Sequence, residues 1–336
     1  MSHYRPLVQQ GRHRPDDALP LAGGPGWFTH ALALARDAAP RIVAARDLPG
    51  AWRERLTAPR ASIAGLAMDR PRIMGILNVT PDSFSDGGRF DAPDRAVDHA
   101  RHMIGAGAEI LDIGGESTRP GAETVPEADE IARIVPALRR IRSEWDGPVS
   151  IDTRKSGVAR AAIHDGASML NDVSALVYDP QMGEIAAQGG LPICLMHAQG
   201  EPETMQADPR YDDVLIDVYD ALSARIDAAL AAGIRRDRIV VDPGIGFGKS
   251  LEHNLALLEG LSLFHGLGLP LLVGASRKRF IGTLGGAGTP AARMPGSVAV
   301  ALHAAGQGAQ IMRVHDVTET RQALTLRHAA INGERE

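Results

Sequence analysis

Eight short apolar runs of the sequence end in polar side chains of the kinds that bind ligands. These side chains belong to Asn78, Asp112, Asp152, Asn171, Asp172, His197, Asp242, Arg313 and His315. One aspartate in such a position often only caps a helix. Four carboxylates and two asparagines in equivalent positions instead indicate a shared binding site.

Two segments add groups that suit an anion. Residues 80–90 (TPDSFSDGGRF) and 114–121 (GGESTRPG) are rich in Gly, Ser, Thr and Pro and hold one arginine each. Segments of this composition close over ligands and offer backbone N–H groups and hydroxyls. Arg119, Arg313 and His315 complete a candidate phosphate site. The alternative is a pair of solvated loops with unrelated arginines.

Other catalytic motifs are absent. The run GIGFGKS at 244–250 ends like a phosphate-binding Walker loop, but Pro243 stands where that loop requires its first glycine. The sequence has no HExxH, no CxxC pair and no GxSxG elbow. A zinc hydrolase or a serine esterase therefore has no support.

The apolar runs themselves predict the fold. They lie at 73–79, 109–113, 148–152, 168–172, 192–196, 238–242, 270–274 and 310–314, and their composition is typical of buried strands. Segments with helical spacing alternate with them, most clearly 131–141 and 214–230. Glycines at 107, 166 and 308 are expected to end helices in the left-handed conformation. Eight such units favour a closed (β/α)8 TIM barrel over an open doubly wound sheet, with the catalytic face at the carboxyl ends of the strands.

The N-terminal part of the chain differs from the rest. Residues 1–70 hold ten arginines and six acids, whereas residues 71–336 hold 26 cations and 35 acids. This contrast predicts an N-terminal extension over 1–70, with a packing role, ahead of a catalytic barrel domain over 71–336. We expect residues 27–35 (WFTHALALA) to form a short helix.

Composition excludes several classes of partner. The net charge is −5 and no long basic block is present, so nucleic acid is not an expected partner. No apolar run approaches the roughly 20 residues that span a bilayer, and no membrane contact is expected. The N-terminus lacks the apolar region of a secretory signal. Because the single Cys194 cannot form an internal disulfide, a cytoplasmic location is expected.

Taken together, the strand-end phrases resemble one family. They are MGILNVTPDSFSDGG (74–88), DIGGESTRPGA (112–122), SIDTRK (150–155), NDVSAL (171–176), MHAQGEPETMQ (196–206), VDPGIGFGKS (241–250), GASRKRFIG (274–282) and RVHDV (313–317). In order and over 72–317, they are similar to the dihydropteroate synthases. That family condenses (7,8-dihydropterin-6-yl)methyl diphosphate with 4-aminobenzoate, and its members are sulfonamide targets.

The resemblance implies a role for each matching residue. The pterin would be bound by Asp152, Asn171, Met196, Asp242, Phe247, Gly274, Lys278 and Arg313. The diphosphate would be bound by Asn78, Ser117, Thr118, Arg119, Arg313 and His315, with Mg2+ held through Asn78. The 4-aminobenzoate pocket would consist of Phe84, Thr118, Pro120 and Lys278.

The implied mechanism is dissociative and resembles SN1. Asp86 would lie near the developing pterin cation, and Arg119, Lys278, Arg313 and His315 would complete the catalytic set. The other two lysines of the chain, Lys155 and Lys249, are expected to support loops. The resemblance also implies a homodimer. One departure is Ala198, where the family often has methionine, and we expect only a local packing change.

Two alternatives stand beside the synthase. A methyltetrahydrofolate:corrinoid methyltransferase shares the pterin-edge residues but handles no diphosphate, so Asn78, the STRPG phrase and RVHDV favour the synthase. A catalytically silent pterin-binding paralogue is expected to have lost loop residues, and none of the synthase set is missing.

Overall fold

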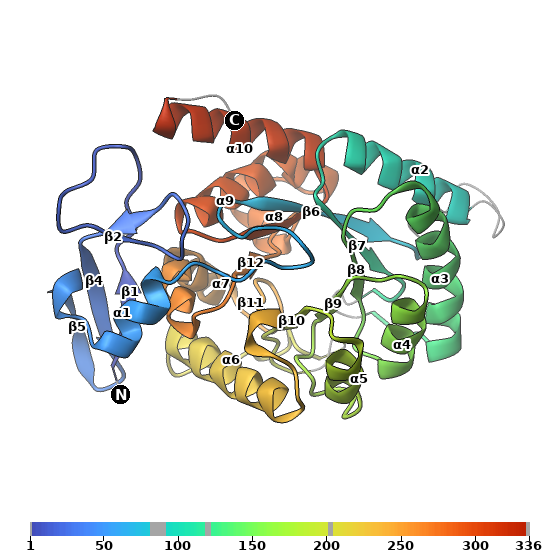
Figure 1. Cartoon of the computed structure of the whole chain (residues 1–336), viewed down its shortest axis with the longest axis horizontal. Helices are drawn as coiled ribbons and strands as arrows, with labels where there is room; N and C mark the ends of the chain where they lie inside the picture. Colours follow the sequence, from blue (N-terminus) through green and yellow to red (C-terminus); the bar gives the residue numbers. More distant parts are fainter. Residues whose placement is uncertain (1, 81–91, 118–121, 201–203, 334–336) are drawn as a thin grey trace.

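Eight parallel strands close into a barrel in the computed structural model, which describes residues 2–80, 92–117, 122–200 and 204–333 (Figure 1). The strands are β6 (Arg72–Asn78), β7 (Ile110–Gly114), β8 (Val149–Asp152), β9 (Met169–Asp172), β10 (Ile193–Met196), β11 (Ile239–Asp242), β12 (Leu272–Val273) and β13 (Ile311–Val314). They pair in the order β11-β10-β9-β8-β7-β6-β13-β12. Closure occurs where Val241 and Leu271 form a parallel bridge and the Val241 N–H donates to the Pro270 carbonyl at 3.0 Å. The predicted TIM barrel is confirmed.

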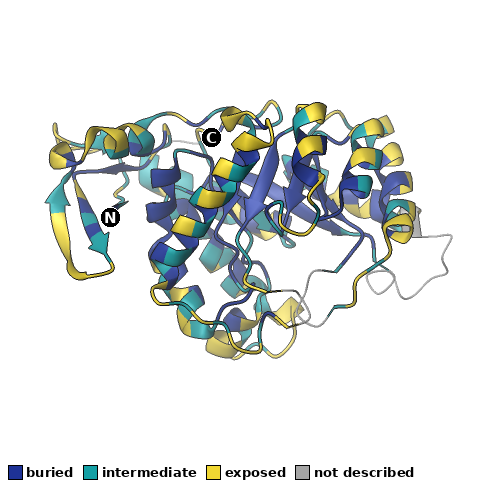
Figure 2. Cartoon of the chain, turned by 90° about the horizontal axis from the view of Figure 1, so that it is seen from below, coloured by how far each residue is buried: buried dark blue, intermediate teal, exposed yellow. Residues whose placement is uncertain are grey.

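Both faces of each strand are buried, which explains the continuous apolar runs in the sequence. Successive side chains of a strand point to opposite sides. Ile73 packs with the helices outside the barrel, whereas its neighbour Met74 belongs to a separate cluster with Ile110 and Cys194 inside it. Figure 2 shows these dark buried strands enclosed by helices whose outer faces are exposed.

Helices follow the strands as predicted. They are α2 (Ala92–Gly105), α3 (Glu127–Glu144), α4 (Ser156–His164), α5 (Met182–Gly189), α6 (Val214–Ala231), α7 (Leu251–Glu259), α8 (Arg279–Gly285), α9 (Met294–Gly306) and α10 (Val317–Asn332), with 3-10 turns η3 (Arg236–Arg238), η4 (Leu261–Leu267) and η5 (Ala291–Arg293). The helices expected at 131–141 and 214–230 correspond to α3 and α6. Among the described helices, none is long and apolar enough to cross a membrane.

The junction glycines adopt the conformation that their position predicted. Gly107, Gly166 and Gly308 have φ of +100°, +96° and +88°. Other residues rarely adopt this region because their Cβ atom meets the backbone. Each glycine therefore lets the chain leave a helix and enter the next strand directly.

The helix predicted at residues 27–35 is wrong. This segment forms β3 (Trp27–Phe28) and β4 (His30–Ala35). β4 pairs in antiparallel fashion with β1 (His3–Pro6) and β5 (Ala38–Ala44), and β3 pairs with β2 (Leu19–Pro20). The Ala and Leu residues favour a helix locally, but Ala31 and Ala33 alternate with more exposed neighbours and face the core of this small sheet. Tertiary pairing overrides helix propensity here.

The rest of the extension joins the sheet to the barrel. Here the chain forms η1 (Ala45–Asp47) and α1 (Gly50–Thr57), and then passes under the amino ends of the barrel strands. Ile63 and Met68 pack with Met74 and Cys194 in the cluster inside the barrel. This part of the extension therefore fills the end of the barrel opposite the strand-end polar residues.

The packing of Ile63 generates a stability prediction. Ile63→Ala is expected to lower the free energy of unfolding by about 2–5 kcal/mol, because the side chain is fully buried and leaves a cavity. Ile42→Ala on β5 is the control, since Ile42 is 65% exposed, and is expected to change it by less than about 0.5 kcal/mol. Urea unfolding of both variants measures the difference, and equal values would contradict the packing role.

Candidate active site

Arg313 on β13 lies between two buried carboxylates at the carboxyl ends of the strands. Its Nε donates to Asp112 Oδ2 at 2.6 Å, and its Nη2 donates to Asp152 Oδ2 at 2.6 Å. Asp112 is fully buried and the Arg313 side chain is 18% exposed. One guanidinium therefore neutralises two carboxylates only in part, and charge-assisted bonds hold all three groups in place.

Strand register aligns further polar residues with this group. Asn78, Gly114, Asp152 and Asn171 are successive partners across β6, β7, β8 and β9. Asn171 Nδ2 donates to Asp112 Oδ2 at 3.1 Å. The expected convergence of Asp152, Asn171 and Arg313 at one end of the barrel is therefore observed.

Asp112 has a larger role than its sequence position suggested. It ends no strand, because β7 continues to Gly114, yet it accepts hydrogen bonds from both Arg313 and Asn171. The sequence placed Asp112 among the strand-end polar residues but gave it no role. The spacing of the sequence could have indicated this role. Asp112 and Gly114 are two residues apart in β7, so they lie on the same side of the strand.

Two buried oxygens in this group have no partner. They are Asp112 Oδ1 and Asp152 Oδ1. Buried polar atoms are nearly always hydrogen-bonded in folded proteins, so unpaired ones mark a position where a ligand donates. A ligand with N–H groups along a flat edge suits these acceptors.

Burial also changes the ionisation of the carboxyls. It raises the pKa of Asp152 to about 7 despite the opposing effect of Arg313. It raises the pKa of Asp242 to about 6, although Asp242 Oδ1 accepts the Gly244 N–H at 2.7 Å. Both groups therefore exchange protons near neutrality and are able to donate or accept a hydrogen bond there.

Lys278 and Phe247 form one wall of the site. The Lys278 ammonium lies 3.7 Å from the centre of the Phe247 ring, and Phe247 packs in a small apolar cluster with Met196. Gly274 follows β12, and a Cβ atom there would stand 3.6 Å from Asp242 Oδ2 and 3.7 Å from Arg313 Cδ. A larger residue at 274 would extend into the space between those two groups.

His315 and Asn78 lie at the ends of neighbouring strands. His315 Nδ1 is 3.0 Å from Ser276 Oγ, which fixes the orientation of the imidazole. Because β13 pairs with β6, the ends of the strands that carry His315 and Asn78 are adjacent. Ser117 follows β7 by three residues. The other predicted residues, Phe84, Asp86, Thr118, Arg119 and Pro120, lie outside the described residues.

Lys155 and Lys249 support loops, as predicted. Lys155 Nζ donates to Glu116 Oε2 at 2.9 Å and to Glu130 Oε2 at 2.5 Å. Lys249 Nζ lies 3.0 Å from His197 Nδ1 and donates to the Phe247 carbonyl at 2.9 Å. Burial lowers the pKa of Lys249 to about 7, so its amine exchanges a proton near neutrality.

Comparison with known proteins agrees with this geometry. The pterin binding enzyme family matches residues 74–315. The dihydropteroate synthase of Escherichia coli strain K12 is 48% identical over 267 residues, which cover 80% of this chain and 94% of that protein. These matches support the predicted synthase activity. They do not support the methyltransferase or the silent paralogue.

Solved structures are similar over the same part of the chain. Xanthomonas albilineans dihydropteroate synthase with 4-aminobenzoic acid has a TM-score of 0.76 and 48% identity, and covers 81% of this chain and 98% of that one. The same enzyme in complex with 7,8-dihydropteroate has a TM-score of 0.74 and 45% identity at the same coverage.

The raised pKa of Asp152 generates a prediction on stability. An acid with a raised pKa binds its proton more tightly in the folded chain, so its contribution to stability falls as pH rises from about 4 to about 7. The change in the free energy of unfolding caused by Asp152→Asn is therefore expected to be more favourable at pH 8 than at pH 5, by about 1 kcal/mol or more.

Urea unfolding of the ligand-free protein at both pH values checks this expectation. Asp165→Asn is the control, because a hydrogen bond from Arg139 lowers the pKa of Asp165, so its removal should destabilise the chain at pH 8. An effect of Asp152→Asn that is equal at the two pH values, or less favourable at pH 8, would contradict the assigned ionisation.

Proposed function

This chain belongs to the dihydropteroate synthases of the pterin binding enzyme family, and we propose that its strand-end residues carry out that condensation in defined roles. The enzyme is a transferase that joins (7,8-dihydropterin-6-yl)methyl diphosphate to 4-aminobenzoate and releases diphosphate. The observation that carries the proposal is the buried group of Asp112, Asp152 and Arg313 with its two unpaired carboxylate oxygens.

The pterin occupies the space between the carboxyls and the Lys278 wall in this proposal. A pterin presents N–H donors along its amidine edge, which match Asp152, Asp242 and the amide of Asn171. Lys278 donates to the ring carbonyl side. Phe247, Met196 and Gly274 set the width of the slot, and Arg313 lies over the ring face, where a planar guanidinium stacks well. Binding then satisfies the Asp152 oxygen that the free chain leaves unpaired.

The diphosphate lies toward the ends of β6 and β13 in the same proposal. His315, Ser117 and Arg313 neutralise or bind its oxygens, together with Thr118 and Arg119. These contacts are stronger when negative charge builds on the leaving group, so they favour the transition state over the bound substrate.

Mg2+ fits the donor groups near Asn78. Among the described residues, no group of three or more His, Cys, Asp or Glu side chains is placed to hold a metal. Mg2+ commonly takes one or two protein oxygens and keeps waters and phosphate oxygens for its other positions. The Asn78 amide oxygen would supply one such ligand, and a bound Mg2+ would neutralise charge on the diphosphate.

The reaction requires no covalent bond to the protein. The carbon–oxygen bond to diphosphate breaks, the electron pair leaves with the diphosphate, and the pterin methylene becomes cationic. Asp86 is proposed to lie near this cation. The amine of 4-aminobenzoate, bound by Phe84, Thr118, Pro120 and Lys278, then forms the carbon–nitrogen bond and loses a proton. The chain holds the two substrates in line and excludes water from the cation.

Assembly as a homodimer and a cytoplasmic location belong to the same proposal. The homodimer rests on the resemblance of the strand-end phrases to the family. The cytoplasmic location rests on the single buried Cys194, which cannot form an internal disulfide.

The pterin assignment is tested by binding and turnover. Asp242→Asn and Lys278→Ala are each expected to weaken binding of the dihydropterin diphosphate by about 10- to 100-fold, because each removes a charged hydrogen-bonding group. Isothermal calorimetry measures the dissociation constants, and condensation assays follow 7,8-dihydropteroate. Asp237→Asn, a change of the same type in an exposed ion pair with Arg235, is the control. Unchanged dissociation constants would contradict the assignment of Asp242 and Lys278 to pterin binding.

The Mg2+ assignment is tested by titration. Release of diphosphate is expected only with Mg2+ or a similar divalent ion, and Asn78→Ala is expected to raise the Mg2+ concentration at half-maximal rate about tenfold or more, through loss of one ligand. Asn332→Ala, at the end of α10, serves as the matched control. Full turnover in excess chelator would contradict the requirement for a metal.

A further inference from the structure

The N-terminal extension contacts the barrel through its basic residues. Arg36, which follows β4, donates to Asp217 Oδ1 at 2.5 Å and to Asp220 Oδ2 at 2.9 Å, both on α6. Arg5 on β1 donates to Glu259 Oε1 at 2.9 Å at the end of α7. The positive extension thus docks on an acidic side of the barrel, and the family match at 74–315 does not include it.

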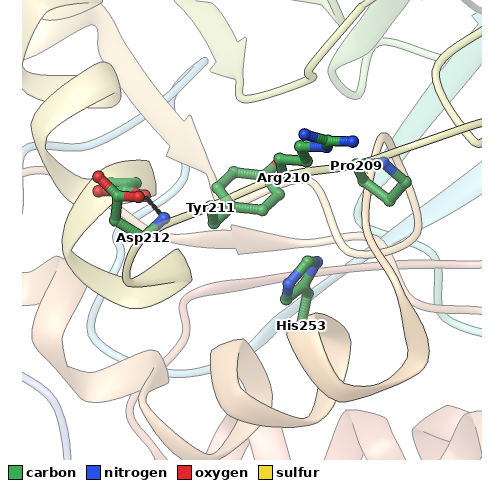
Figure 3. A pocket seen from close by; sticks show the side chains of 6 residues that line it. Pro209, Arg210, Tyr211, Asp212 and His253 are labelled. Carbon is green, nitrogen blue, oxygen red and sulfur yellow. Dashed lines mark hydrogen bonds between the residues drawn. The ribbon is translucent and has the colours of Figure 1, made fainter.

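Asp217 has a second set of contacts that lead away from the extension. Its other oxygen, Oδ2, accepts the backbone N–H of Asp212 at 2.9 Å and of Asp213 at 3.3 Å. Figure 3 shows the first of these bonds beside Tyr211 and His253. Asp213 is also the N-cap of α6, since its side chain accepts the N–H groups of Leu215 and Ile216. The carboxylate that Arg36 contacts therefore fixes the backbone immediately before α6.

Tyr211 extends this chain of contacts to the candidate active site. Its hydroxyl donates to the Gly248 carbonyl at 2.8 Å, and its ring packs edge-on to His253 at 4.9 Å. Gly248 stands between Phe247, which forms the wall with Lys278, and Lys249. Gly248 has φ of +60°, and a Cβ atom there would lie 2.4 Å from the Gln199 carbonyl oxygen, so only glycine fits this close approach of the two backbones.

We propose that Arg36 is a positioning residue for the pterin slot, acting through Asp217, the backbone of 212–213 and Tyr211 on the loop that carries Phe247. The inference rests on the proposed function of that slot. Arg36 touches no substrate. Through Arg36 the N-terminal extension takes part in substrate binding, because Arg36 restrains the 211–213 segment that contacts the loop carrying Phe247.

The size of the effect follows from the exposure of the ion pair. The Arg36 side chain is 45% exposed and that of Asp217 is 24% exposed. Exposed pairs contribute little, so loss of the guanidinium is expected to weaken pterin binding only about two- to fivefold. A direct substrate contact would have a larger effect.

The experiment compares Arg36→Met with Arg5→Met in the full chain. Both variants keep an apolar side chain. Arg36→Met removes the ion pairs with Asp217 and Asp220, whereas Arg5→Met removes the ion pair with Glu259 at the far end of α7, which does not involve the backbone of 211–213. The readouts are the dissociation constant for the dihydropterin diphosphate, the KM for 4-aminobenzoate, and hydrogen exchange of the Asp212 and Asp213 amides.

The expected result for Arg36→Met is faster amide exchange at 212–213 and about two- to fivefold weaker pterin binding, with an unchanged KM for 4-aminobenzoate. Arg5→Met should match the wild type in all three readouts. In a Tyr211→Phe background, Arg36→Met should have a smaller effect on pterin binding, because the connecting hydroxyl is gone.

Three results would overturn the inference: equal exchange in the two arginine variants, unchanged pterin binding in Arg36→Met, or multiplicative effects of Arg36→Met and Tyr211→Phe. Wild-type protein that binds pterin but forms no 7,8-dihydropteroate would contradict the proposed function alone. Wild-type protein that binds no pterin would overturn both.

Discussion

The candidate active site depends on one guanidinium shared by two buried carboxylates. Arg313 contacts both Asp112 and Asp152, but burial, with the charge of Asp112 as a smaller cause, raises the cost of keeping Asp152 ionised without a ligand. Such groups persist only where surrounding structure holds them, because removing charges from water is costly. Here parallel strands with fully buried faces supply that support. A ligand with N–H donors lowers the free-energy cost of the buried carboxylates, and this gain contributes to the free energy of binding.

The loops around the group of Arg313, Asp112 and Asp152 are fixed by contacts outside that group. Lys155 joins Glu116 to Glu130, and Lys249 joins His197 to the Phe247 carbonyl. Neither lysine contacts the predicted substrate edge, yet each fixes a loop that carries ligand residues. The N-terminal extension adds a third brace through Arg36 and Asp217. Substrate recognition at the barrel mouth therefore draws on contacts from distant parts of the chain.

Local signals predicted the barrel because each was strong and consistent. Apolar runs five to seven residues long, with a glycine before several of them, match buried parallel strands, and the spacing of Val214 to Leu230 matches α6. The extension was harder. The alanines and leucines of 27–35 favour a helix, but their pairing partners in β1 and β5 lie before and after them in the sequence, and that pairing decides their conformation. The role of Asp112 was missed because its partners Arg313 and Asn171 are distant in the chain.

The sequence by itself determined the family, the number and order of the strands, and the residue types at their carboxyl ends. The strands follow from local periodicity, and the family follows from motifs that are contiguous in the sequence. Only the tertiary structure decided which of those residues meet. Strand register and barrel closure bring Arg313 to Asp112 and Asp152 and leave two oxygens unpaired. Docking of the N-terminal extension on α6 brings Arg36 to Asp217. Hydrogen-bond distances and burial arise from packing between residues far apart in sequence, which no local pattern encodes.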